Sequence, residues 1–152
     1  MTGHVAQFHI KDNEWNSALS HINFALATGG YIAFESRNPD VQPWINKEQK
    51  LHDDWYSPNY RRKVIDSVAG PIEVWSEIID IKDRKVTTDI HYLFTKTGEE
   101  LLSRNELIFR SREEITQSLE KTGFSIENIY GNWDWSFANN ESPEFIFVAV
   151  HK

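Results

Sequence analysis

Apolar residues recur at spacings of three and four early in the chain, a pattern that predicts an amphipathic helix. The stripe consists of Trp15, Ala18, Leu19, Ile22, Ala25 and Leu26. We expect Asp12 or Asn13 to cap this helix and Gly29 or Gly30 to end it. The apolar run Tyr31-Ile32-Ala33-Phe34 then predicts a buried strand. A helix that passes directly into such a strand is half of an alternating α/β unit.

Polar residues follow this strand before Pro39, namely Glu35, Arg37 and Asn38. Because ligands of α/β sheets bind where the strands end, these three side chains are candidates for a binding site. A solvated strand end with an ion pair accounts for the same residues equally well.

Residues 40–71 carry a weaker pattern. Pro39 and Pro43 mark a loop, residues 44–60 suggest broken helical pieces, and residues 61–68 suggest one or two further helical turns before Gly70. Residues 72–110 alternate between apolar and polar positions, which predicts an antiparallel meander of three strands. Its two turns are expected at residues 82–85 and 97–99.

The last part of the chain, residues 111–152, predicts a helix and two strands. Ser111 and Glu114 have the spacing of a capping box, and the helix should end at Gly123. Strands are expected at residues 124–130 and 144–150, with a polar and aromatic loop between them. The second of these strands is apolar throughout, as in a strand at the centre of a sheet. We expect one domain with parts at 1–39, 40–71, 72–110 and 111–152.

Composition narrows the possible classes of protein. A chain of 152 residues with 39% hydrophobic content is long enough for its own core. The net charge of −7 argues against non-specific nucleic-acid binding, and no apolar run is long enough to cross a membrane. The absence of cysteine excludes disulfides and thiolate chemistry. We expect a cytoplasmic protein.

The chain lacks the common catalytic motifs: there is no zinc-protease motif, nucleophile elbow or phosphate-binding loop. We expect no metal site, because His4 and His9 have no carboxylate between them. Arg110, Trp133 and Asp134 are further candidates for a substrate site. Each also has a structural interpretation, the arginine as the partner of a carboxylate and the Trp133-Asp134-Trp135 segment as a packed surface loop.

The order of several motifs resembles that of bacterial class I S-adenosylmethionine-dependent methyltransferases. The motifs are Thr2-Gly3-His4, Gly29-Gly30, Phe34 to Pro39, Leu107 to Ser111, Gly123-Phe124, Tyr130 to Asp134 and Ser142-Pro143-Glu144. The resemblance covers nearly the whole chain but only the C-terminal half of such an enzyme. It implies an α/β protein, α+β in this fragment, with a partial Rossmann-like sheet and an inserted three-stranded antiparallel lid.

The resemblance also implies roles for individual residues. Thr2, Gly3 and His4 would line the cofactor or reaction pocket, with His4 as the base to test first. Glu35, Arg37, Asn38, Trp55 and Tyr56 would face a small-molecule acceptor, together with Arg110, Trp133 and Asp134. The family's glycine-rich loop and the acidic residue at the end of its second strand are absent from this sequence. We therefore expect S-adenosylmethionine to bind this chain weakly or not at all.

The family's sheet places another strand beside the one at residues 31–37, and that neighbour is absent here. An apolar strand edge is seldom left open. We expect either residues 5–10 to pair as a substitute strand or two copies to form a homodimer. A truncated product, a mis-assigned start and one part of a split enzyme all fit the resemblance.

Two other hypotheses remain from the residues. In the first, the chain is a stand-alone small-ligand-binding module in which Trp75, Tyr92 and Phe109 line a cavity. Alternatively, it is a non-catalytic partner of an intact methyltransferase. None of the residues specifies the chemical class of the acceptor.

Overall fold

The computed structural model describes residues 1–41 and 60–152. These residues divide into two compact units, one of residues 1–41 with 107–152 and the other of residues 60–106. The prediction of a single domain stays a prediction. The broken helical pieces predicted at residues 44–60 fall almost wholly outside the described residues.

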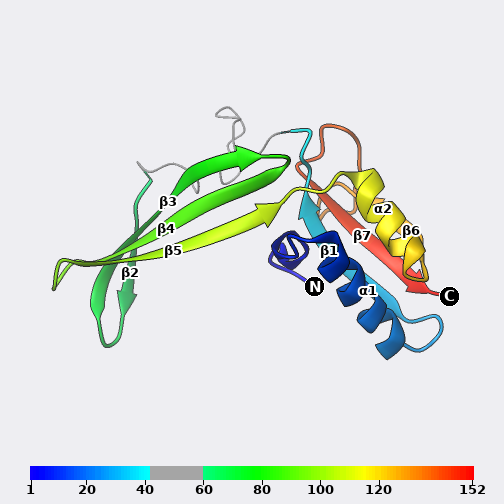
Figure 1. The fold of residues 1–152 in the computed structure, drawn as a ribbon, viewed down its shortest axis with the longest axis horizontal. Helices are drawn as coiled ribbons and strands as arrows, with labels where there is room; N and C mark the ends of the chain where they lie inside the picture. Colours follow the sequence, from blue (N-terminus) through cyan, green and yellow to red (C-terminus); the bar gives the residue numbers. More distant parts are fainter. Residues whose placement is uncertain (42–59) are drawn as a thin grey trace. The chain divides into compact units, whose positions relative to one another are not determined.

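The first unit is a three-stranded antiparallel sheet with two α-helices and one 3₁₀ turn. Its elements are the 3₁₀ turn η1 (Val5–Phe8), α1 (Asp12–Ala25), β1 (Tyr31–Arg37), α2 (Arg112–Lys121), β6 (Phe124–Tyr130) and β7 (Glu144–His151). The strand order is β1-β7-β6, so the closing strand lies at the centre, as its continuous apolar run predicted (Figure 1). Val5 to Ile10 do not form the substitute strand that we considered.

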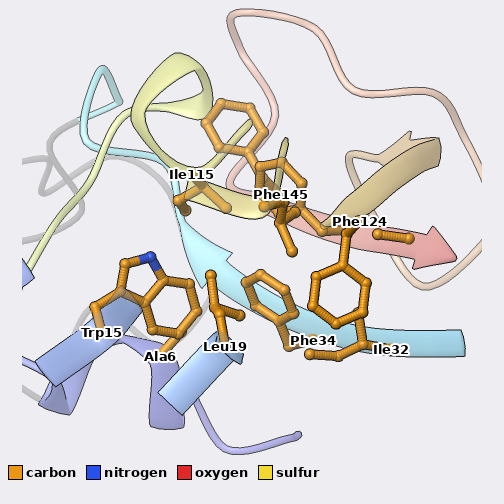
Figure 2. Close-up of a cluster of buried hydrophobic side chains, with 11 residues drawn as sticks. Ala6, Trp15, Leu19, Ile32, Phe34, Ile115, Phe124 and Phe145 are labelled. Atoms are coloured by element: carbon orange, nitrogen blue, oxygen red, sulfur yellow. The ribbon is translucent and has the colours of Figure 1, made fainter. Parts of the chain in front are cut away.

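One face of this sheet packs against both helices. Phe34 of β1 stacks on its cross-strand neighbour Phe147 of β7 with ring centroids 5.5 Å apart, and it meets Trp15 of α1 edge-on. Figure 2 shows Trp15 and Leu19 beside Phe34. The buried cluster consists of Ala6, Trp15, Leu19, Ile32, Phe34, Ile115, Leu119, Phe124, Phe145, Phe147 and Ala149. The apolar stripe of the sequence is thus the buried side of α1.

The ends of the two helices differ in how well they were predicted. Ser111 and Glu114 form the capping box of α2, with Glu114 N–H donating to Oγ of Ser111 at 3.2 Å and Ser111 N–H donating to Oε2 of Glu114 at 2.8 Å. For α1 the cap prediction was wrong. Lys11 is the N-cap residue, and its side chain has no acceptor for a cap bond. Asp12 is already helical, and its carboxylate binds Arg110.

The second unit contains β2 (Arg62–Asp66), β3 (Gly70–Lys82), β4 (Lys85–Phe94) and most of β5 (Glu99–Ile108). They form one sheet in the order β2-β3-β4-β5 (Figure 1). The predicted meander is confirmed, but the sheet has four strands and not three, since residues 62–66 are a strand and not a helical turn. Asp66 closes the extra hairpin by accepting the N–H groups of Val68 and Ala69, and these bonds lower the pKa of its carboxyl.

The fold class is therefore mostly β, with two helices and two antiparallel sheets. Both sheets are antiparallel in the described parts of the chain, in line with the α+β arrangement expected for this fragment, and the parallel pairing of a complete Rossmann-like sheet is not seen among the described strands. Among the described residues, no helix combines the length and the hydropathy needed to cross a membrane.

Candidate functional site

The face of the first sheet that points away from the helices carries charged residues at one end. Side chains alternate along a strand, so Glu35 and Arg37 of β1 lie on the face opposite Phe34. Because β7 runs antiparallel to β1, its first residue, Glu144, stands directly across from Arg37. The antiparallel register thus places the start of β7 at the predicted strand-end site.

His4 reaches this group through an unusual backbone conformation. Gly3 and His4 both have positive φ, 76° and 57° respectively, and a non-glycine residue is strained there. The conformation lets the backbone N–H of His4 donate to Oε1 of Glu35 at 2.8 Å. The imidazole Nε2 lies 2.7 Å from Oε1 of Glu144. One residue therefore contacts both strands, and we call His4, Glu35, Arg37 and Glu144 the His4 cluster.

The charge of Glu144 is stabilised within this cluster. The hydrogen bond from His4 holds the pKa of the Glu144 carboxyl below its usual value, against the opposing effect of burial. The charges of His4 and Arg37 and a hydrogen bond from Trp133 add to the lowering of this pKa. Glu144 therefore stays ionised at neutral pH and at mildly acidic pH.

Arg37 is held by a buried amide. Its Nη1 donates to Oε1 of Gln7 at 3.1 Å, and Gln7 is almost wholly buried, with 1% of its surface exposed. The Nε2 of Gln7 donates in turn to the carbonyl of Ile108. The 3₁₀ turn thus fixes the guanidinium beside the His4 cluster.

Glu35 is the other buried carboxylate of the cluster. Glu35 has only 3% of its surface exposed, and one of its carboxylate oxygens, Oε1, accepts the His4 N–H. The second oxygen, Oε2, is buried and has no hydrogen-bond partner in the described part of the chain. A buried polar atom without a partner is uncommon and is often found at a functional site.

Asn38 lies next to the cluster and has a bonded role. It is fully buried, and its Nδ2 donates to the carbonyls of Asn140 and Ser142. Its Oδ1 accepts the N–H of Asp40. Asn38 therefore ties the end of β1 to the loop before β7, and its proposed contact with an acceptor stays a prediction.

Arg110 belongs to a different contact. It is buried, and its guanidinium donates to Oδ1 of Asp12 and to the carbonyl of His9 while lying 5.5 Å from the Trp15 ring centroid. Pairing with a carboxylate was one of the two interpretations considered for this arginine.

The remaining predicted site residues are less constrained. Thr2 is exposed beside Gly3. Asp134 accepts the N–H of Ser136 in the loop between β6 and β7. Hydrogen bonds from the side chain and the backbone of Ser136 lower the pKa of the Asp134 carboxyl. Trp133 is 60% exposed. Trp55 and Tyr56 lie outside the described residues. The described ranges contain no group of three side chains suited to hold a metal ion.

The second unit has a hollow of about 380 Å³ on one face of its sheet. It is lined by Arg62, Val64, Ile72, Val74, Ser76, Ile90 and Tyr92. Of the three residues expected to line a cavity, Tyr92 lines this hollow, and Trp75 and Phe109 do not. Trp75 lies between His91, with which it stacks at 4.7 Å, and Arg61, and Phe109 is buried in the first unit.

No family model and no curated protein matches the chain. Solved structures do match. A S-adenosylmethionine-dependent methyltransferase from Clostridium acetobutylicum ATCC 824 covers 99% of the chain with a TM-score of 0.72 and 11% identity. The methyltransferase CcbJ from Streptomyces caelestis covers 99% with a TM-score of 0.66 and 13% identity. CalS10, an amino pentose methyltransferase from Micromonospora echinaspora, covers 99% with a TM-score of 0.58 and 17% identity.

The chain has the fold of the C-terminal part of these methyltransferases. It spans 56%, 55% and 57% of their respective lengths, which is little more than half. The methyltransferase resemblance seen in the sequence is thereby confirmed at the level of the fold.

Two residues of the site were missed in the sequence, Glu144 and Gln7. In the sequence, Glu144 was assigned as the start of the last strand and as part of the Ser142-Pro143-Glu144 motif, without a role in the site. Its position opposite Arg37 follows from the antiparallel pairing of β7 with β1, which the local sequence pattern does not indicate. Gln7 gives no local signal, because its burial depends on a 3₁₀ turn that the sequence pattern does not indicate.

Proposed function

We propose that this chain is the acceptor-binding, C-terminal part of a S-adenosylmethionine-dependent methyltransferase. The observation that supports it best is the structural match over 99% of the chain at a TM-score of 0.72. The His4 cluster adds to this, since it lies at the carboxyl end of β1, where ligands of such sheets bind.

The described residues fit only part of the cofactor. Gly3 has open space where a Cβ would stand, so its backbone can be approached by a ligand. A site for this cofactor also needs a carboxylate that binds the ribose hydroxyls. Glu35 does not supply it, because its side chain is buried and already binds the His4 N–H. Another polypeptide segment has to supply the main cofactor contacts, and the chain alone is expected to bind the cofactor weakly or not at all.

When bound, S-adenosylmethionine supplies a methyl group on a sulfonium sulfur. The contribution of this chain is to orient the acceptor and to remove a proton from its O, N or C nucleophile where the chemistry needs it. His4 is the proposed base, since its ring is half-buried and contacts a carboxylate. Arg37, Trp133 and Asp134 are proposed to contact the acceptor.

The acceptor is proposed to be a small molecule. CalS10 is described as an amino pentose methyltransferase and KedS8 from Streptoalloteichus as a sugar N-methyltransferase. Those descriptions concern those proteins, but they make amino sugars the first acceptors to test here.

The partner is proposed to be either the N-terminal half of a methyltransferase or a second copy of this chain. In the described part of the chain, β1 is one of the two edge strands of its sheet. One of its outward-facing carbonyls, that of Ala33, accepts the amino group of Met1 at 2.6 Å, which covers a single position of the edge. A further strand along β1 would pair the other outward-facing groups.

A stand-alone ligand-binding module is the second candidate, favoured by the hollow of about 380 Å³ in the second unit. This volume falls within the range of small-molecule sites. Under this hypothesis, the apolar residues around Tyr92 bind the ligand and no cofactor is involved.

The test compares this chain with a longer one that includes any coding sequence found in frame before Met1. Calorimetry should show S-adenosylmethionine binding to the longer chain and weak or no binding to this chain. Micromolar binding to the short chain would contradict the expected absence of cofactor contacts. If the longer chain also fails to bind, the methyltransferase proposal fails and the ligand-binding module is favoured.

A further inference from the structure

We propose that Glu144 is the positioning residue for His4, holding the imidazole so that Nε2 carries the proton and Nδ1 is free to act as the base. This inference rests on the proposed function for the identity of the base, but the contact that it concerns can be tested without cofactor or acceptor.

The geometry of the pair shows which ring nitrogen carries the proton. A distance of 2.7 Å between Nε2 of His4 and Oε1 of Glu144 is that of a strong, charge-assisted hydrogen bond. A carboxylate can only accept, so the proton of this bond belongs to Nε2. The nitrogen that makes the hydrogen bond decides which ring nitrogen remains available for chemistry. Because Nε2 makes the bond to Glu144, the nitrogen that remains available is Nδ1.

Glu144 is itself held in place within the cluster. Nε2 of His4 lies 2.7 Å from its carboxylate, and Arg37 stands directly across from it on β1. The carboxylate is therefore fixed in position and negative when the base acts. It stabilises the imidazolium that forms after proton transfer, as a carboxylate does in other histidine-dependent sites.

The backbone of His4 is also fixed. The residue adopts φ of 57°, and its N–H is bound by Glu35. With the backbone bound by one carboxylate and the ring by another, the imidazole has little rotational freedom. Such a residue is preorganised for a single direction of proton transfer.

The proposed step is a simple proton transfer. The bond between the acceptor's nucleophilic atom and its hydrogen breaks, and a new N–H bond forms at Nδ1 of His4. The electron pair stays on the nucleophile. The imidazolium then has its Nε2–H directed at Glu144. Arg37, Glu35 and the Trp133 indole are the other charged or polar groups of the described chain that face this pair.

The test uses the purified full chain with Glu144→Gln and Glu144→Ala, and Glu141→Gln as the matched control at an exposed site. In nitrogen-15 NMR, the Nε2 proton of His4 should be visible and slow to exchange in the wild type and the control. It should be lost in Glu144→Ala, whereas Glu144→Gln can still accept this proton and should retain part of the protection.

A second measurement separates positioning from mere structural support. Diethyl pyrocarbonate acylates nucleophilic imidazole nitrogens, and peptide mass spectrometry gives the rate at each histidine. His4 should react several-fold more slowly in Glu144→Gln, which keeps the shape but loses the charge, while the rate at His21 should not change. Equal rates at His4 in wild type and Glu144→Gln would overturn the proposal, as would fast exchange of the Nε2 proton in the wild type. If Glu144→Ala does not fold, Glu144→Gln alone decides.

Discussion

The backbone N–H of His4 donates to Oε1 of Glu35 at 2.8 Å, although the two residues are 31 positions apart. This bond holds the strained turn at Gly3 and His4 against the end of β1. It holds the His4 backbone together with the bond from Gln7 N–H to the His4 carbonyl and the bond from the Met1 amino group to the Ala33 carbonyl. The imidazole then lies 2.7 Å from Glu144.

Glu35→Ala should destabilise the first unit and release this turn. A hydrogen bond to a carboxylate contributes about 1.5–3 kcal/mol, and the strained φ of His4 then loses its compensation. Glu35→Gln keeps an acceptor oxygen for the His4 N–H and should have a smaller effect. Urea unfolding measures both. Equal destabilisation by the two variants would show that the backbone bond is not what Glu35 contributes.

Glu144 should make stability depend on pH. Its pKa is lowered in the folded protein, so its contribution is fully present above the unfolded pKa and is lost as the pH falls through the lower, folded value. We expect Glu144→Gln to reduce the loss of stability below about pH 5, near the unfolded glutamate pKa. Thermal melts at several pH values measure this. Glu120→Gln, at an exposed site on α2, is the control and should behave like the wild type.

The pKa of Glu144 should also respond to His4. The hydrogen bond from His4 is the largest cause of the lowering, so His4→Ala should raise the pKa of Glu144 toward its usual value. Carbon-13 NMR of the side-chain carboxyl follows this titration. An unchanged titration in His4→Ala would mean that Arg37 and Trp133 account for the lowering, and the pair would be weaker than its 2.7 Å separation indicates.

Asn38 should behave as a structural residue. Asn38→Leu leaves the carbonyls of Asn140 and Ser142 without their donor, at a cost of about 1–3 kcal/mol. Asn38→Asp should destabilise more, since it turns a carboxylate toward two carbonyl oxygens. Asn140→Asp, at an exposed site, is the control. If Asn38→Asp leaves the melting temperature unchanged but alters acceptor binding, Asn38 belongs to the acceptor site instead.

How much could be read from the sequence depended on the range of the interactions. The capping box of α2 was predicted correctly, because Ser111 and Glu114 are three residues apart and no other part of the chain is needed. The strand β2 was missed. Its residues are almost all exposed and show no alternation, so only pairing with β3 reveals it.

The site shows the same limit. Glu35 and Arg37 were predicted as candidates because they end a buried strand. Glu144 was not, since it lies 140 residues from His4 and meets it only through the register of β7 against β1. Gln7 was missed for a related reason, as its burial follows from the packing of η1 near the carbonyl of Ile108.

Among the described residues, no strand pairs with the outer edge of β1. This edge gives the last prediction, that the chain self-associates through β1 when no other segment covers it. Ala33 is exposed, and its carbonyl points outward, where it accepts the Met1 amino group. In an antiparallel strand the N–H of a residue points to the same side as its C=O, so the N–H of Ala33 also faces the edge. Ala33→Pro removes this donor without removing a bond to β7, and proline is tolerated on edge strands. We expect light scattering to show a dimer for the wild type and for Ala33→Ser, and a monomer for Ala33→Pro. A monomeric wild type at high concentration would contradict pairing between copies. The proposed partner of β1 would then be a different polypeptide.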